Sequence, residues 1–154
     1  MSRYEGYVSF PLGWLKLEAD EQHLLAVSYC DEKGTDRPNA LIHKARKQLR
    51  EYFSGQRRNF SLPLLITGTE FQQRIYEALA QVPYESTVSY RDLTYMAGNR
   101  RGFQATGQAV HNNRYMIIIP CHRVINHDGS LGGYGGREDI KRYLLQLEGT
   151  VLDQ

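Results

Sequence analysis

The stretch from Ile117 to Ile125 constrains this chain more than any other, because an apolar run passes directly into reactive side chains. Its three consecutive isoleucines favour a short buried strand or another extended core segment. Pro120 has no N–H group to donate, so we expect the strand to end there. Cys121 follows where the core would give way to a site. A free cysteine is more often a buried small hydrophobic residue than a nucleophile, and both interpretations stay open on this stretch alone.

Length and cysteine content set the broad class. The chain has 154 residues, enough for one ordinary domain or two small ones. No apolar run approaches roughly 18 residues, and the first ten residues lack the pattern of a secretory signal. The two cysteines, Cys30 and Cys121, are therefore expected to stay reduced in an intracellular, cytoplasmic setting. No CxxC pair is present, so we expect no metal, and no nucleotide-binding motif is present, so we expect no cofactor.

Charge distribution is more informative than net charge, which is only +2. Between Ser86 and His127 the only acid is Asp92, and every basic residue except histidine is an arginine: Arg91, Arg100, Arg101, Arg114 and Arg123. Arginine suits forked contacts with phosphate. On charge alone, a phosphate-binding face and an ordinary solvated basic face are about equally well supported.

The first part of the chain predicts a small antiparallel sheet followed by a helix. Apolar and polar residues alternate in three runs separated by turn residues: 4–10, 14–19 and 23–29. After Pro38, apolar residues recur at helical spacing over 41–53. The segment 60–66 is typical of an edge strand or a connecting loop. We therefore expect two domains, an N-terminal α/β subdomain over 1–66 and a second domain over 67–154.

The second domain predicts several helices, two of which resemble a helix-turn-helix. Thr69 is suited to cap the first helix. Ser89 is suited to cap the next, over 90–97, with Asp92 at the third helical position in an arrangement like a capping box. A Gly-Asn turn and two arginines then lead to a helix over 103–111 that is rich in small and amide residues. Such a pair suits contacts with bases and phosphates, although many helical hairpins bind nothing.

A glycine-rich loop and a final helix follow the central stretch. The loop, residues 131–136, surrounds Tyr134 and lacks the spacing of a nucleotide-binding motif. We expect either a flexible linker or a loop that closes over a flat ligand. The final helix runs over 137–148 and ends in Glu148, an unfavourable place for an acid, so we expect this carboxylate to have a partner. One such partner is His122, whose imidazole it would orient.

The ordered motifs of the chain resemble those of the O6-alkylguanine-DNA alkyltransferases, the methylated-DNA–protein-cysteine methyltransferases. The resemblance extends from about Thr69 to Gly149, and the first 66 residues match in architecture only. The signature that carries it is Pro120-Cys121-His122-Arg123-Val124. The supporting motifs are Val88-Ser89-Tyr90-x-Asp92-Leu93, Asn113, Gly133-Tyr134-x-Gly136 and Leu144-Leu145-x-x-Glu148-Gly149.

This resemblance implies repair of DNA by transfer of an alkyl group to the protein. Cys121 would accept the alkyl group irreversibly, in a single turnover, after activation through water by His122, which Glu148 holds. Asn113 would brace the helix-turn-helix against the site. Tyr90 would lie beside the DNA backbone and protonate or stabilise the departing guanine. The guanine must be flipped out of double-stranded DNA, because a thiolate cannot reach its alkyl carbon inside the stack.

The resemblance also implies a fold and further site residues. The fold would be α+β, with an RNase H-like N-terminal subdomain and a mostly helical, winged-helix-like C-terminal domain that acts as a monomer. The residues expected to contact DNA are Gln104, Ala105, Thr106, Gln108, Arg100, Arg101 and Arg123. Those expected to line the substrate pocket are Tyr134, Gly135, Val124 and Met116. From the residues alone, Arg123 is better suited to hold carboxylates or carbonyls in the core.

Three positions depart from the family pattern. Gln104 stands where the family usually has the arginine that replaces the extruded base, Gln108 where glycine is frequent, and Arg114 where proline is usual. We expect the changes at 104 and 108 to affect base extrusion more than thiol chemistry, and Arg100 or Arg101 is an alternative source of the missing arginine. The family's zinc-bearing variants use extra N-terminal Cys and His, and with only Cys30 present we expect no zinc. The alternatives are a non-catalytic lesion-binding protein, which Cys121 disfavours and Gln104 favours, and a transcriptional regulator.

Overall fold

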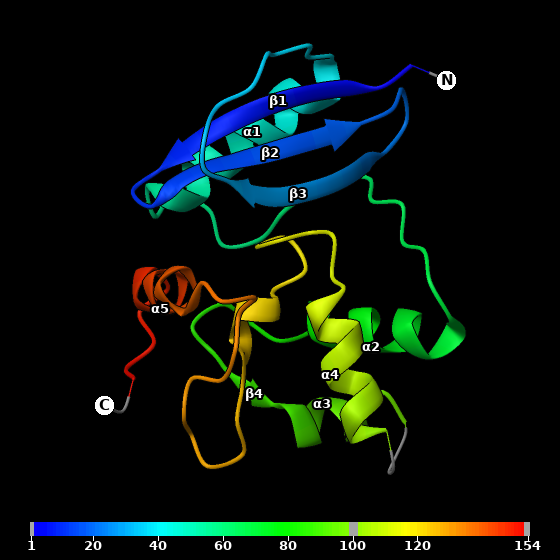
Figure 1. Ribbon diagram of the computed structural model, residues 1–154, viewed down its shortest axis with the longest axis vertical. Helices are drawn as coiled ribbons and strands as arrows, with labels where there is room; N and C mark the ends of the chain where they lie inside the picture. Colours follow the sequence, from blue (N-terminus) through cyan, green and yellow to red (C-terminus); the bar gives the residue numbers. More distant parts are fainter. Residues whose placement is uncertain (1, 99–101, 153–154) are drawn as a thin grey trace. The chain divides into compact units, whose positions relative to one another are not determined.

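The computed structural model describes residues 2–98 and 102–152 and divides into two units (Figure 1). The first unit comprises the chain up to Ile66 together with Arg114–Ile118. The second comprises Thr67–Asn113 and the chain from Ile119 onward. Each unit is described by itself. In the described ranges, no helix combines the length and the apolar character needed to cross a membrane.

The first unit is a three-stranded antiparallel sheet covered by one helix. The strands are β1 (Tyr4–Phe10), β2 (Gly13–Ala19) and β3 (Leu24–Cys30), in the order β1-β2-β3. The helix α1 (Ala40–Phe53) begins after Asn39, whose side chain accepts a hydrogen bond from the backbone N–H of Ile42. Alternate strand residues and one stripe of α1 are buried together: Val8, Leu15, Leu17, Val27, Ile42, Ala45 and Leu49. The predicted sheet and helix are confirmed.

Two further segments join the edge of this sheet. Residues 60–66 form no regular strand, but Leu64 makes a single parallel bridge to Leu24. Tyr115 makes a second parallel bridge, to Val27. The buried hydroxyl of Tyr115 lies 2.7 Å from the carbonyl oxygen of Leu24 and 2.6 Å from that of Leu65, and it accepts the Leu65 N–H at 3.1 Å. One phenol group therefore connects both additions to β3.

The isoleucine run is buried as predicted, but the predicted strand is wrong. Residues 116–118 form a turn in which Ile118 N–H donates to Met116 C=O. Ile117 has φ +73°, a conformation that is rare for a β-branched residue. Regular pairing is confined to Val124–Ile125 (β5), which pairs in parallel with Val88–Ser89 (β4). The chain passes from the first unit to the second after Ile118, and Ile117 and Ile119 are both buried. A turn meets both requirements, whereas a straight strand would stay in one unit.

The second unit is mostly helical. Its helices are α2 (Glu70–Ala80), α3 (Tyr90–Met96), α4 (Phe103–His111) and α5 (Glu138–Leu147). Thr69 caps α2 in a full capping box, and the Ser89 side chain accepts the Asp92 N–H at the start of α3. The helix α2 packs against both α3 and α4. The expected pair of short helices joined by a turn is therefore present, and the described part of α4 has the predicted bounds.

We expect Tyr115→Phe to destabilise the first unit, because it removes a buried hydroxyl and leaves buried backbone groups of Leu24 and Leu65 without that partner. The free energy of unfolding should fall by about 1–3 kcal/mol. Thermal unfolding followed by circular dichroism measures the change. The control is Tyr95→Phe at an exposed tyrosine, which should have the same thermal unfolding midpoint as the wild type. An equal midpoint for the two variants would contradict the role of Tyr115.

Candidate active site

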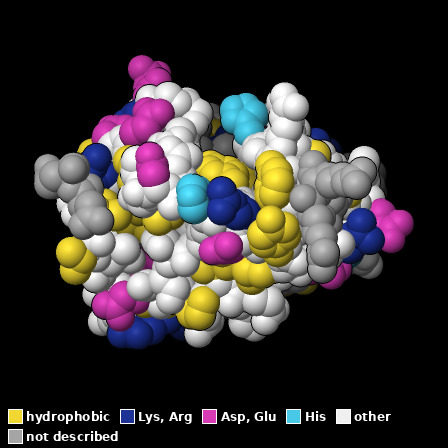
Figure 2. All heavy atoms as spheres, turned by 90° about the horizontal axis from the view of Figure 1, so that it is seen from below, with side chains coloured by type: hydrophobic (Ala, Val, Ile, Leu, Met, Phe, Trp, Pro, Cys, Tyr) yellow, Lys and Arg dark blue, Asp and Glu magenta, His cyan; other side chains and the backbone are white. Residues whose placement is uncertain are grey.

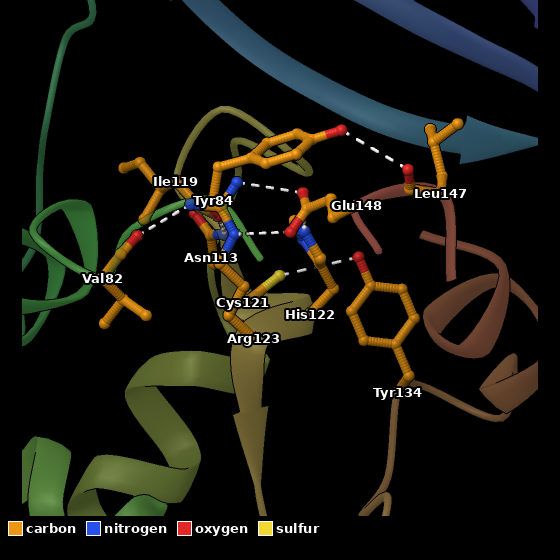
Figure 3. Close-up of polar contacts among 10 residues, drawn as sticks. All are labelled: Val82, Tyr84, Asn113, Ile119, Cys121, His122, Arg123, Tyr134, Leu147 and Glu148. Atoms are coloured by element: carbon orange, nitrogen blue, oxygen red, sulfur yellow. Dashed lines mark hydrogen bonds and ion pairs between the residues drawn. The ribbon is translucent and has the colours of Figure 1, made fainter. Parts of the chain in front are cut away.

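The reactive side chains of the central stretch lie on one turn of 3-10 helix, η1 (Cys121–Arg123), which follows Pro120. An extended segment would send Cys121 and His122 to opposite faces. A 3-10 turn has three residues per turn, so the three side chains leave the axis in three directions instead. All three are buried. Figure 3 shows the thiol directed toward Tyr134 while His122 and Arg123 both reach Glu148.

Polar neighbours surround the Cys121 thiol. It donates to the Tyr134 hydroxyl with a sulfur–oxygen distance of 3.7 Å. The Asn113 side chain also hydrogen-bonds Cys121, and its Nδ2 donates to the carbonyl oxygen of Ile119 at 2.8 Å. Burial raises the pKa of the Cys121 thiol, while its hydrogen bonds with Asn113 and Tyr134 act against that rise. At rest the group is therefore a neutral thiol that needs a base.

His122 follows Cys121 on η1 and is held by a buried carboxylate. Its Nε2 lies 2.7 Å from Oε2 of Glu148, and both side chains are fully buried. Burial lowers the pKa of His122, against the opposing effect of Glu148, so the imidazole is neutral. A neutral ring that donates from Nε2 has its lone pair on Nδ1. That buried atom has no hydrogen-bond partner in the part of the chain that the structure describes.

Arg123 neutralises the buried carboxylate of Glu148. Its Nε donates to Oε1 at 2.8 Å and its Nη2 to Oε2 at 2.9 Å, a forked pair. Nη1 donates to the carbonyl oxygen of Val82 at 2.7 Å, and the guanidinium lies over the ring of Tyr84. The expected contact between Arg123 and DNA is therefore corrected, because the group is buried in the core. The core role that the residue type suggested is the one observed.

Two tyrosines come from different elements of the second unit. Tyr90 is the first residue of α3 and is half-buried. Burial and, to a smaller extent, the charge of Cys121 raise the pKa of Tyr90, so its hydroxyl keeps its proton near neutral pH. Tyr134 lies on the glycine-rich loop, where Gly135 has φ +59° and Gly136 has φ +81°. Such values are rare for residues with a Cβ, which explains the glycines beside this ring.

The other predicted residues separate into accessible and inaccessible ones. On α4, Gln104, Ala105 and Gln108 are exposed. Thr106 is buried, and its hydroxyl is hydrogen-bonded to that of Thr94 at 2.7 Å, so its expected DNA contact is corrected to a helix–helix contact. Val124 is buried in β5 and Gly135 is exposed. Met116 belongs to the first unit. Arg100 and Arg101 lie outside the described residues.

Lys141 is a site residue that the sequence analysis missed. Its side chain is fully buried on α5, and its Nζ donates to the carbonyl oxygens of Val124 at 2.5 Å and Gly133 at 3.4 Å. It thus connects the strand after η1 to the loop that carries Tyr134. Burial lowers the pKa of Lys141 to about 8, and the charge of Cys121 opposes that fall. The signal was available, because Lys141 stands three and four residues before Leu144 and Leu145 on the buried face of α5.

Removing the Glu148 carboxylate should destabilise the protein strongly. Glu148→Leu leaves the Arg123 guanidinium buried without its counter-ion, which costs about 3–5 kcal/mol of unfolding free energy. Arg123→Met should cost a similar amount because it strands the carboxylate. The double variant should be more stable than either single variant, because it buries no unpaired charge. Denaturant unfolding of the four proteins forms the cycle, and additive losses would show that the two groups are not coupled.

Loss of the Lys141 charge should slow alkylation of Cys121. A positive charge near a thiol favours the thiolate, so Lys141→Met should lower the rate near pH 7 by about tenfold to a hundredfold through loss of that charge. Lys141→Arg keeps the positive charge, so its alkylation rate should fall less. The rates of the wild type and of Lys141→Met should converge above about pH 8, where Lys141 itself loses its proton.

Iodoacetamide labelling in a Cys30→Ser background, followed by mass spectrometry between pH 6 and about 9, measures this effect. Replacing Cys30 leaves Cys121 as the single thiol of the chain. Equal unfolding midpoints would show that the variants are folded. Parallel pH profiles for the wild type and Lys141→Met, with no convergence, would rule out the charge as the cause.

Both units match models of known protein domains. The model described as the ribonuclease-like domain of 6-O-methylguanine DNA methyltransferase matches residues 3–66. The model described as the DNA binding domain of the same protein matches residues 70–150. Together the two models cover nearly the whole chain.

Known proteins are similar over the same length. The constitutive methylated-DNA–protein-cysteine methyltransferase of Bacillus subtilis is 37% identical over 149 residues, which cover 90% of each chain. The crystal structure of the Mycobacterium tuberculosis O6-methylguanine methyltransferase superposes with a TM-score of 0.85 at 34% identity, covering 96% of this chain and 93% of the other. A crystal structure of Mycobacterium tuberculosis OGT in complex with DNA gives a TM-score of 0.83 at 36% identity, covering 92% and 91%. The chain therefore belongs to the O6-methylguanine DNA methyltransferase family.

Proposed function

We propose that this chain is a methylated-DNA–protein-cysteine methyltransferase that repairs O6-alkylguanine in DNA by accepting the alkyl group on Cys121. The observation that carries this proposal is the arrangement of the buried thiol with a neutral His122 that is bonded to Glu148. It lies within the residues that match the DNA binding domain of the family. A structural cysteine needs neither a neighbouring base nor a carboxylate that orients that base.

The proton of the thiol moves first. We propose that it passes through a water molecule to Nδ1 of His122, and that Glu148 stabilises the imidazolium that forms. Because Arg123 already balances the charge of Glu148, the carboxylate stays ionised throughout. The neutral resting state of His122 is what makes the imidazole available as a base.

Transfer of the alkyl group follows. The Cys121 sulfur attacks the alkyl carbon, a carbon–sulfur bond forms, and the bond between that carbon and O6 of guanine breaks. The electron pair of the broken bond stays with the guanine, which takes up a proton, so the proton lost by the thiol is balanced. The protonated hydroxyl of Tyr90 is suited to stabilise the leaving base. A thioether is not hydrolysed, so each molecule reacts once.

The substrate would be a guanine flipped out of double-stranded DNA. In the proposal, Tyr134 and Gly135 of the glycine-rich loop line its pocket together with Val124, and the exposed residues of α4 contact the duplex. Asn113 braces the turn before Cys121 through its bond to Ile119. We propose that the chain acts as a monomer with domains 1–66 and 67–154. A reducing cytoplasm would keep Cys121 as a thiol.

Intact mass after incubation with an oligonucleotide that carries O6-methylguanine tests the function. We expect the protein to gain the mass of a single methyl group in place of a hydrogen, located at Cys121 by peptide analysis. Cys121→Ser should gain nothing, while Cys30→Ser should behave like the wild type. Tight binding of the lesion without any change of mass would instead support the alternative, a lesion-binding protein without transfer activity.

A further inference from the structure

An exposed apolar cluster occupies the junction of the two predicted DNA-binding helices. Tyr95 and Met96 end α3 with 49% of each residue exposed, and Phe103 begins α4 with 42% exposed. Among the described residues only two other large hydrophobic residues, Leu65 and Val151, are as exposed. Figure 2 shows hydrophobic side chains gathered on this side of the molecule. A cluster of this kind on a protein surface commonly marks an interaction site.

The cluster contains a preformed aromatic pair. The rings of Tyr95 and Phe103 meet edge to face, with their centroids 5.8 Å apart and their planes at 79°. This geometry is the favourable one for two aromatic rings. Tyr95 therefore braces Phe103 from the neighbouring helix, while a large part of the Phe103 ring stays in water. A ring held in this way loses little entropy when it inserts into a partner.

Position and charge indicate the partner. Phe103 directly precedes Gln104 and Ala105, the exposed residues that begin the predicted DNA face of α4. The opposite side of α4, with Thr106 and Ala109, is buried against its neighbours and is not available. The chain around the cluster is net basic, because Arg91 and Asp92 are both exposed on α3 and two further arginines stand in the sequence between α3 and α4. A second copy of this chain would bring like charges together, whereas a polyanion would not.

We propose that Phe103, braced by Tyr95, is the wedge that enters the DNA stack where the alkylated guanine has left it. This proposal rests on the proposed function, because it supplies what base extrusion requires. Extrusion breaks stacking on both sides of the guanine, and apolar side chains of DNA-bending proteins compensate for such a loss by inserting between base steps. Stacking needs a ring. Gln104 beside it offers hydrogen bonds to the base left unpaired, but no ring and no charge.

Comparing two substrates distinguishes an effect on base extrusion from an effect on the thiol chemistry. Duplex DNA with O6-methylguanine requires extrusion, whereas free O6-benzylguanine requires none. Phe103→Ala should slow transfer from the duplex by about tenfold to a hundredfold, the range of one lost base–aromatic stack, and should leave the reaction with the free base within about twofold. Phe103→Trp keeps a ring and should retain most of the duplex rate. Tyr95→Ala should give a smaller loss, again confined to the duplex.

Met96→Ala is the matched control, because Met96 is as exposed as Tyr95 but contributes no ring. It should react with both substrates at the rate of the wild type. An equal loss for Met96→Ala would make the cluster a general docking surface and overturn the wedge, as would an unchanged duplex rate for Phe103→Ala. Self-association that disappears in Phe103→Ala, measured by sedimentation, would assign the cluster to a second copy. Failure of the wild type with both substrates would instead refute the proposed function.

Discussion

The rest of the active site depends on one buried carboxylate that is shared between a guanidinium and an imidazole. Glu148 receives a forked pair of hydrogen bonds from Arg123 and a further one at 2.7 Å from His122. With His122 as its only partner, the carboxylate would favour the charged imidazolium, and burial opposes that charge. With Arg123 as the permanent counter-ion, the trio holds one positive and one negative charge, and the imidazole stays neutral. The same contacts attach Glu148, at the C-terminal end of α5, to η1, so one set of bonds positions the imidazole and the turn that carries the thiol.

Burial also keeps the resting thiol neutral, which protects it from side reactions. Burial raises the pKa of Cys121, and the groups that oppose this rise are the hydrogen-bonding side chains of Asn113 and Tyr134 and the positive charge of Lys141. A thiol that is neutral and buried reacts slowly with chance electrophiles, because the thiolate is the nucleophile. For a protein that is consumed by one transfer, each such side reaction would waste a molecule. A low reactivity of the resting thiol is therefore compatible with the proposed function, provided that the thiol is deprotonated when the substrate is bound.

The sequence predicted local structure well wherever a side chain acts on its own backbone. Thr69 and Ser89 cap helices as expected, and the bounds of α4 follow from its residues. It failed at Ile117, because a β-branched run indicates burial but does not fix the backbone, and this run must turn between two units. It failed at Thr106, because the side of α4 that packs on α3 is set by tertiary contacts. It missed Lys141, because a lysine on an apolar helix face gains meaning only when the carbonyl groups that face it are known.

In the proposed mechanism, different parts of the second unit carry the thiol chemistry and the base extrusion. This separation would allow the residues for extrusion to vary while the thiol site stays the same. The thiol, the imidazole and Glu148 are buried and held by several bonds each, so a change there leaves a charge or a polar atom without a partner. The start of α4 faces water, and a substitution there costs the fold little. A glutamine at position 104 in place of a charged side chain therefore leaves the fold and the thiol untouched. Compensation would come from nearby residues: the sequence offers Arg100 and Arg101, and among the described residues Phe103 has a ring already in place.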